Sequence, residues 1–259
     1  MNQPQVSIMM VNYNRAEFIG LAIQSVLDQS LKDWELLVVD DGSVDLSEEI
    51  IKSFSEKDDR IVYLKNEENL GIVYSRNKAI KNSKADLIAV LDSDDIWVDS
   101  FKLEKQFNKF KEDKDLVLVG GGVIEINKEG VEKKRYLNPL NDKNIRKEIL
   151  SRNPFAHSSV MFKKSVVERI SGYSDLQIGE DYDLWLRLGK EGKLLNLGDY
   201  LVKYRVHDKN TCNTKTIQAL KNNISFVFKY RKSYGGFYFA LLRRLPRYVV
   251  GLILFKIKR

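Results

Sequence analysis

The stretch Leu87-Ile88-Ala89-Val90-Leu91-Asp92-Ser93-Asp94-Asp95 is the part of the sequence that decides the fold. Its first five residues are apolar, which is typical of a short strand that is buried on both faces. Three carboxylates follow within four residues, and such crowding is unfavourable unless a cation neutralises the charges. Mg²⁺ and Mn²⁺ take oxygen ligands, often few from protein, with phosphate oxygens supplying the rest. The simpler alternative is an acidic turn that caps a helix near Ser100.

Two earlier stretches repeat this pattern of an apolar strand followed by polar residues. Val6–Val11 leads into Asn12-Tyr13-Asn14, and Trp34–Val39 leads into Asp40-Asp41-Gly42-Ser43. In a parallel sheet, the ligand crevice lies at the carboxyl ends of the strands. We therefore expect these two polar clusters and the acidic cluster at 92–95 to converge on one site.

Apolar residues at helical spacing separate these strands. The spacing predicts helices at 17–27, 46–54 and 72–80, and a further short strand is expected at 61–64. Short apolar strands that alternate with helices predict an α/β fold, in which helices flank both faces of a mostly parallel sheet.

The second half of the chain is less regular. Strands of a mixed sheet are expected at Leu116–Ile126, Val131–Leu137, Phe155–Phe162 and Tyr200–Val206, and a helix starts at Asp181. With 259 residues and 43% hydrophobic content, the chain is long enough for one large domain and a short appendage. We place the domain at 1–215 and a basic helical tail at 216–259.

The single cysteine and the N-terminus bear on the cellular compartment. Cys212 is the only cysteine, so an intramolecular disulfide cannot form, which fits a reducing compartment. The N-terminal sequence MNQPQVSIMMVNYN has no basic segment ahead of a long apolar stretch, so a secretory signal is not expected. The expected location is the cytoplasm.

Positive charge is concentrated at the C-terminal end. The formal net charge is +7, but ten basic and no acidic residues follow Lys215, which leaves 33 basic against 36 acidic residues before it, a net of −3. The positive net charge of the whole chain therefore comes from the tail alone, and no nucleic-acid partner is expected.

The tail mixes aromatic and aliphatic residues with arginines. Phe237–Phe255 is interrupted by Arg243, Arg244, Pro246 and Arg247, so its uncharged runs are shorter than the roughly 20 residues of a membrane span. The composition suits an amphipathic helix at the inner, anionic surface of a membrane. The alternatives are a helix packed on the domain or a dimer contact.

Five further residues are candidates for binding or catalysis. Tyr13 either stacks on a base or packs in the core, and Asp41 could accept a base N–H while Gly42 makes the turn. His207 at a strand end could ligate a metal or bind diphosphate. The acidic pair Glu180-Asp181 begins a helix, where it either complements the helix dipole or supplies a general base.

Seven motifs, in order over roughly residues 5–212, resemble the family 2 glycosyltransferases of the GT-A fold. They are Val6–Asn14, Val38–Ser43, Gly71 with Arg76-Asn77, Leu91–Asp95, His157-Ser158-Ser159, Glu180-Asp181 and Tyr204–His207. Asn12 and Val11 depart from the residues most frequent at their positions in the family, which bears on nucleoside preference.

The resemblance implies an inverting transfer of a sugar from a nucleotide-diphosphate donor, most often a UDP-sugar, to a hydroxyl of a glycan or lipid-linked glycan. Residues 1–97 would then form the nucleotide-binding half and 98–215 the acceptor-binding half. Bacterial surface polysaccharide assembly is the usual setting, and Mn²⁺ or Mg²⁺ is the implied cofactor. The implied donor-site residues are Val11, Tyr13, Asp41, Arg76, Asp92 and Ser93, the metal ligands Asp94 and His207, the base Asp181 with Glu180 beside it, and the acceptor-side residues His157 and Trp185.

Three other functions compete with this one. A nucleotidyltransferase also pairs carboxylates with a metal, but it usually has a glycine-rich loop after the first strand, which Asn12-Tyr13-Asn14-Arg15 lacks. An aspartyl-nucleophile phosphatase would carry its acidic pair on the first strand rather than the fourth. A catalytically inactive sugar-binding or scaffolding domain is disfavoured by the intact Asp92, Asp94, Asp181 and His207.

Overall fold

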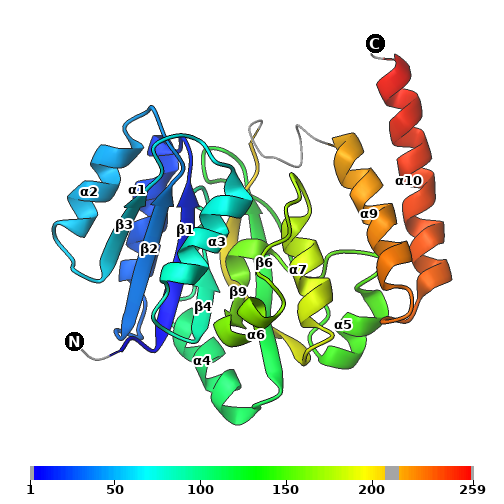
Figure 1. The fold of residues 1–259 in the computed structure, drawn as a ribbon, viewed down its shortest axis with the longest axis horizontal. Coiled ribbons are helices and arrows are strands. Elements are labelled where there is room, and N and C mark those ends of the chain that lie inside the picture. The colour runs from blue at the N-terminus through cyan, green and yellow to red at the C-terminus, as the bar shows by residue number, and fades with distance from the viewer. Residues whose placement is uncertain (1–2, 208–215, 258–259) are drawn as a thin grey trace.

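A computed structural model describes residues 3–207 and 216–257 of the chain, with side chains up to Gly251. Cys212 lies outside the described residues, and so does residue 215 at the predicted domain boundary. The described residues fold around one sheet with helices on both faces (Figure 1). The strands are β1 (Val6–Asn12), β2 (Trp34–Asp40), β3 (Ile61–Lys65), β4 (Leu87–Val90), β5 (Ile96–Trp97), β6 (Leu116–Ile126), β7 (Glu132–Tyr136), β8 (Met161–Lys163) and β9 (Lys193–Arg205).

The sheet is mixed and mostly parallel, as the sequence predicts. Its order is β3-β2-β1-β4-β8-β6-β9-β5, and β7 pairs with β6. The pairs β1–β2, β1–β4, β2–β3 and β6–β9 are parallel, whereas β8 lies antiparallel between β4 and β6. Because β8 runs against both neighbours, β6 and β9 point the same way as β1, β2 and β4. Their carboxyl ends therefore share one edge of the sheet.

The helices divide the hydrophobic core into two layers. Ile8 and Met10 of β1 face one cluster, while Met9 between them faces the other, as expected for a strand buried on both faces. The first layer is covered by α1 (Ala16–Leu27), α2 (Ser47–Ser55) and α4 (Lys102–Glu112). The second is covered by α3 (Ile72–Asn82), α5 (Asp142–Glu148), α6 (Lys164–Arg169), α7 (Glu180–Leu188), α9 (Thr216–Tyr230) and the inner side of α10 (Phe237–Ile257).

The strand expected at Phe155–Phe162 is wrong for most of its length. Residues His157–Ser159 form a 3₁₀ turn, η1, and only Met161–Lys163 pair as a strand. The turn is closed locally, because both the backbone N–H and the hydroxyl of Ser159 donate to the carbonyl of Ala156, at 3.0 and 2.8 Å. This turn lifts His157 out of the sheet and toward the carboxyl edge of β4.

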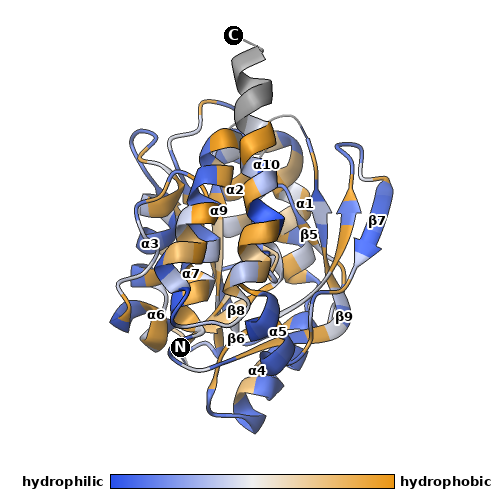
Figure 2. Ribbon diagram, turned by 90° about the vertical axis from the view of Figure 1, so that its right-hand side faces the viewer, coloured by the Kyte–Doolittle hydropathy of each residue, from blue (hydrophilic) through white to orange (hydrophobic). Residues whose placement is uncertain are grey.

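The C-terminal helices pack on α7. Asp183, fully buried in α7, accepts hydrogen bonds from Lys229 Nζ at 2.9 Å and Tyr230 Oη at 2.8 Å, both on α9. From α10, Arg244 donates to the hydroxyl of Tyr182 at 2.6 Å and to the carbonyl of Leu150 at 2.7 Å. α9 and α10 run antiparallel and pack on each other. The outer side of α10 faces the viewer in Figure 2. In the described parts of the chain, no helix has the length and apolar content that crossing a bilayer demands.

Candidate active site

A cavity of about 540 Å³ opens at the carboxyl ends of β1, β2 and β4. The first turn of α7 and residues of β7 and β9 form its other walls. The polar clusters that follow β1, β2 and β4 do converge, as expected from a parallel sheet. Of the twelve predicted site residues, ten line this cavity: Val11, Tyr13, Asp41, Arg76, Asp92, Ser93, Asp94, His157, Glu180 and Asp181.

His207 does not line the cavity itself, but it contacts Asp94, which does. Its Nε2 lies 3.0 Å from Asp94 Oδ2, and its ring stacks on Phe18 with the centroids 5.5 Å apart. Arg15 Nε lies 3.3 Å from the same carboxylate oxygen. The end of β9 and the loop after β4 are thereby joined at Asp94.

Asp92 is held by two cationic or hydrogen-bonding side chains. His157 Nδ1 lies 3.0 and 3.1 Å from its two carboxylate oxygens, and Arg76 Nη2 lies 3.2 Å from Oδ1. The ring's Nε2 lies 2.9 Å from the hydroxyl of Tyr173, so a proton on Nδ1 satisfies both contacts. Burial alone would raise the pKa of Asp92, but the charges of His157 and Arg76 hold it well below its usual value.

Arg76 connects the acidic loop to α7. It lies on α3, is 4% exposed, and forms a close ion pair with Glu180 in addition to its contact with Asp92. Its guanidinium carbon lies 5.3 Å from the ring centre of Tyr173. A buried guanidinium between two carboxylates fixes both of them, since each would be costly to bury alone.

Asp181 is the less constrained acid of the pair on α7. It is half-buried at the cavity wall, and its Oδ2 accepts a hydrogen bond from Asn153 Nδ2 at 3.1 Å. The pKa of Asp181 is raised by burial and, secondarily, by the negative charge of Glu180. A carboxylate with a raised pKa at the wall of a cavity has the properties of a general base.

Asp41 is bound by the loop that precedes α3. Oδ1 accepts from Asn66 Nδ2, the backbone N–H of Leu70 and Ser75 Oγ, at 2.7, 3.0 and 2.9 Å. Oδ2 accepts from the N–H of Gly71 at 2.9 Å. Asp41 therefore shapes the loop at 69–71 that forms part of the cavity wall.

The third acid of the loop, Asp95, points away from the cavity and fixes the loop from beneath. It accepts from Ser158 Oγ at 2.5 Å and from the backbone N–H of Arg205 at 2.8 Å, and it is 1% exposed. The Arg205 side chain donates to the Asp94 carbonyl at 2.9 Å. Burial, followed by the charges of Asp94 and Asp92, raises the pKa of Asp95 well above its usual value.

Trp185 does not occupy the position that the sequence predicts. It is fully buried and does not line the cavity. Its ring packs against Phe155, Phe162 and His157, with centroids 6.1–6.3 Å apart. Trp185 thus lies beneath His157 as part of the core, because only the first turn of α7 reaches the cavity.

The lining residues that the predicted site lacked include Arg15, Tyr136 and Asn153. Arg15 directly follows Asn12-Tyr13-Asn14, so its position after the first strand was a usable signal. Tyr136 and Asn153 come from irregular parts of the second half, where no pattern in the sequence marks them.

The donor atoms at Asp94 and His207 are suitable for a divalent ion. Within residues 3–207 and 216–257, no group of three or more His, Cys, Asp or Glu side chains is arranged to hold a metal by itself. Asp94 and His207 nevertheless offer one carboxylate oxygen and one imidazole nitrogen at the same point. Mg²⁺ and Mn²⁺ sites often use one or two protein carboxylates and take their other ligands from phosphates and water, so this pair fits such an ion.

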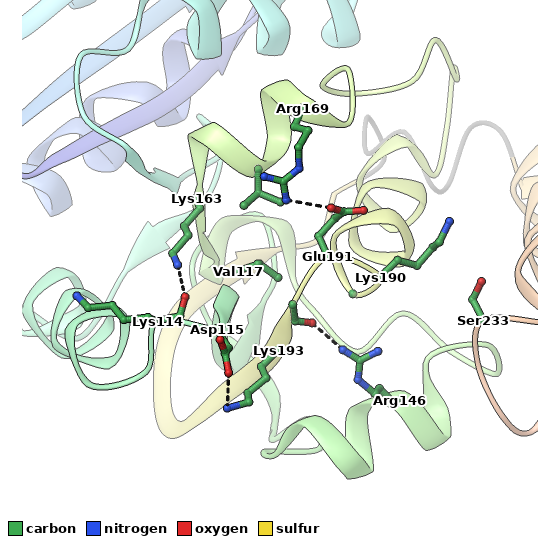
Figure 3. Close-up of a pocket in the computed structure, with 13 residues that line it drawn as sticks. Lys114, Asp115, Val117, Arg146, Lys163, Arg169, Lys190, Glu191, Lys193 and Ser233 are labelled. Atoms are coloured by element: carbon green, nitrogen blue, oxygen red, sulfur yellow. Dashed lines mark hydrogen bonds and ion pairs between the residues drawn. The ribbon is translucent and has the colours of Figure 1, made fainter.

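A larger hollow of about 760 Å³ lies at the opposite edge of the sheet, near the starts of β6 and β9 (Figure 3). Most of its charged side chains bind one another or the backbone. Arg169 pairs with Glu191 at 2.9 Å, and Lys193 with Asp115 at 3.1 Å. Its two carboxylates, Asp115 and Glu191, are engaged in these ion pairs, and none of the predicted site residues lines it, so we assign the active site to the smaller cavity.

Comparison with known proteins agrees with this geometry. The family model described as Glycosyl transferase family 2 matches residues 7–171. The O-antigen biosynthesis glycosyltransferase WbnJ of Escherichia coli is 33% identical over 212 residues, covering 80% of this chain and 81% of WbnJ. The putative glycosyltransferase EpsE of Bacillus subtilis is 33% identical over 233 residues, covering 87% of this chain and 81% of EpsE.

Solved structures share the fold at lower sequence identity. S. aureus TarS 1–349 in complex with UDP superposes with a TM-score of 0.67 at 18% identity, over 86% of this chain and 65% of that one. The mannosyltransferase PcManGT from Pyrobaculum calidifontis, in complex with GDP-Man and Mn²⁺, gives 0.69 at 16% identity, over 90% and 65%. The chain thus spans slightly under two thirds of these structures. Its curled, mostly parallel sheet is the GT-A fold, and the chain belongs to glycosyl transferase family 2.

Proposed function

We propose that this glycosyltransferase transfers a sugar from a UDP-sugar to a hydroxyl of a glycan or lipid-linked glycan, with inversion at the anomeric carbon. One observation carries the proposal. Asp94, Arg76, Asp92 and Asp181 line one cavity and His207 contacts Asp94 there, although these residues come from four separate stretches of chain.

The donor's nucleoside is assigned to the wall formed by Val11, Tyr13 and Asp41. Tyr13 is 43% exposed at the cavity, which leaves its ring face available to a base. Among the described residues, Oδ2 of Asp41 accepts one hydrogen bond, from the N–H of Gly71, so a lone pair is available to a base N–H. The choice of uracil follows the structural neighbour TarS, which was solved with UDP and with UDP-GlcNAc.

The diphosphate is assigned to the end of the cavity at Asp92, Ser93 and Asp94. Bound Mn²⁺ or Mg²⁺, held by Asp94 and His207, would neutralise the charge that develops on the departing diphosphate. Arg15, whose Nε lies 3.3 Å from Asp94, brings a further positive charge to the same end. Arg76 holds Asp92 in place through the contact at 3.2 Å.

Asp181 is assigned as the general base that removes the proton from the acceptor hydroxyl. Its raised pKa makes it a better proton acceptor than an ordinary aspartate. Glu180 is neutralised by Arg76, so we assign it the role of positioning Arg76 and keeping the pKa of Asp181 high. His157 contacts Asp92, so we assign it to the donor side of the reaction.

The acceptor is assigned from the aromatic residues that line the cavity and from a relative of this chain. Half-buried or exposed aromatic rings, Tyr136 and Tyr204, line the cavity together with Phe155 and Ile178. Such rings suit the apolar faces of a sugar. WbnJ is described as acting in O-antigen biosynthesis, which supports a polysaccharide acceptor for this chain.

Release of UDP by the purified full chain tests this function. With Mn²⁺ and a panel of UDP-sugars, at least one donor should be turned over, and the product's anomeric configuration should be opposite to that of the donor. Asp181→Asn should lower kcat by about a hundredfold or more, as expected for loss of a general base. Asp175→Asn, an exposed acid six residues upstream, is the matched control. Near-normal kcat in Asp181→Asn would overturn the assignment, and no turnover of any donor would favour an inactive sugar-binding domain.

A further inference from the structure

One side of α10 is apolar and faces solvent. Exposed apolar residues on it include Tyr238 at 79%, Leu242 at 76%, Leu245 at 48% and Val249 at 46%. Their spacing of four, three and four residues places them in one stripe along the helix. Phe239 and Val250 widen the stripe at its two ends, and Figure 2, which looks onto this side, shows orange residues along the front of α10.

The opposite side of α10 is already used by the domain. Ala240 is fully buried and Arg244 is 8% exposed, with its guanidinium bonded to Tyr182 and to the carbonyl of Leu150. The helix cannot roll to hide its outer stripe without breaking these contacts. The stripe is therefore a fixed feature of the surface, which we call the outer face of α10.

Charge identifies the kind of partner. From Thr216 to the end of the chain there are ten basic residues and no acidic ones. Arg247 lies in the helix beside the outer face and is exposed. A second copy of the chain on this face would bring two strongly positive segments together, which is unfavourable. An anionic lipid surface offers both apolar depth for the stripe and negative charge for the arginines.

We propose that the outer face of α10 binds anionic membranes as an interfacial helix. Figure 1 shows that α10 runs past the sheet on the side where β1 and the other parallel strands end, which is the side of the active site. A membrane lying along α10 thus flanks the catalytic end of the molecule. Membrane binding would bring the active site close to a lipid-borne acceptor, and this advantage rests on the function proposed above. The membrane binding itself does not depend on that function.

The test is co-sedimentation of the full-length chain with vesicles. Binding to vesicles with about one third phosphatidylglycerol should exceed binding to pure phosphatidylcholine vesicles by about tenfold or more, and high salt should weaken it. Leu242→Glu and Val249→Glu should each reduce the binding to anionic vesicles about tenfold or more, because a carboxylate would enter the apolar interface. Arg247→Glu should also reduce it, with a smaller effect at high salt.

Two controls make the result specific. Leu21→Glu introduces the same charge at an apolar side chain of α1 that is 55% exposed, and it should pellet like the wild type. Asp181→Asn should also pellet like the wild type, because it leaves the outer face of α10 unchanged. Vesicle binding is thereby tested independently of catalysis. Circular dichroism checks that each variant is folded, and Leu245→Ser provides a milder substitution on the same face.

Two results would overturn the proposal. One is equal pelleting of the wild type, Leu242→Glu and Val249→Glu. The other is a wild-type dimer in sedimentation velocity that Leu242→Glu dissociates, without vesicle binding by either protein, since this would assign the outer face to a second copy.

Discussion

His207 Nε2 lies 3.0 Å from Asp94 Oδ2, although 113 residues separate them in the chain. β9 delivers the histidine and the loop after β4 delivers the carboxylate, so the pair forms only when the two halves of the sheet are joined. This contact provides the most direct test of the proposed metal requirement. His207→Ala should raise the Mn²⁺ concentration for half-maximal turnover by about tenfold or more, a loss typical of disturbed metal ligation. An unchanged Mn²⁺ dependence would place the ion elsewhere.

The pH profile should report the environment of Asp181. A base must be ionised to act, so kcat/KM falls as pH drops through its pKa, which lies above the usual value here. Glu180→Gln removes the neighbouring negative charge and leaves the Arg76 charge less neutralised, and both changes lower the pKa of Asp181. The acidic limb of the profile should therefore move to lower pH. Glu56→Gln, at an exposed site, is the control and should leave the limb in place.

Loss of Arg76 should destabilise the fold as well as the site. Arg76→Met leaves Glu180 and Asp92 without their buried cation, and removing one partner of a buried ion pair costs about 3–5 kcal/mol. Chemical denaturation measures the change in the free energy of unfolding. Arg135→Met, which breaks an exposed pair with Glu132, serves as the comparison and should have little effect. Similar values for the two variants would contradict the role assigned to Arg76.

Two glycines near the donor site should respond differently to alanine. Gly42 has φ +74°, and a Cβ there would lie 2.6 Å from the backbone carbon of Glu68. Gly71 has φ +91°, but a Cβ there meets no atom within 4 Å. Both substitutions carry a backbone cost of about 1–3 kcal/mol, and only Gly42→Ala adds a clash with main chain. Gly42→Ala should therefore have the lower Tm, and the reverse order would show that the loop at 68–69 yields readily.

Lys102 should make stability rise with pH. Its side chain is fully buried, donates to Gln106 Oε1 at 2.7 Å, and lies 4.0 Å from the ring centre of Trp97. Burial lowers the pKa of Lys102 well below 10.5. The unfolded chain then binds more protons than the native one, so the free energy of unfolding increases as pH rises between the native pKa and 10.5. Lys102→Met should flatten this dependence in denaturation series at several pH values.

The parallel half of the sheet could be predicted because its strands are buried on both faces. β1, β2 and β4 appear in the sequence as largely apolar runs, with Ser7 and Glu35 as the polar exceptions, and polar residues follow each run directly. The rule that parallel strands share a carboxyl edge then brings Tyr13, Asp41 and Asp92 together without any knowledge of distances.

Contacts between segments that are far apart in the chain could not be predicted from the sequence. His157 was expected on a strand, but hydrogen bonds of Ser159 close a turn whose stability depends on local geometry rather than apolar spacing. The Arg76–Glu180 pair joins residues 104 positions apart, and no periodic pattern indicates such a pairing. The resemblance implies an acceptor-side role for Trp185, whereas the apolar spacing of Leu184, Trp185 and Leu188 indicates burial, as the structure shows.

The bonds of Asp183 limit how the chain can be recombined with its relatives. This acid follows the proposed base by two positions on α7. Its Oδ1 accepts hydrogen bonds from Lys229 and Tyr230 of the C-terminal helices, and its Oδ2 accepts from Ser174 and Arg187. A chimera that kept the first 215 residues and took its last helices from another protein would leave a buried carboxylate short of partners one half-turn from Asp181. Such a graft should succeed only when the incoming helices supply a cation and a hydroxyl at the places of Lys229 and Tyr230.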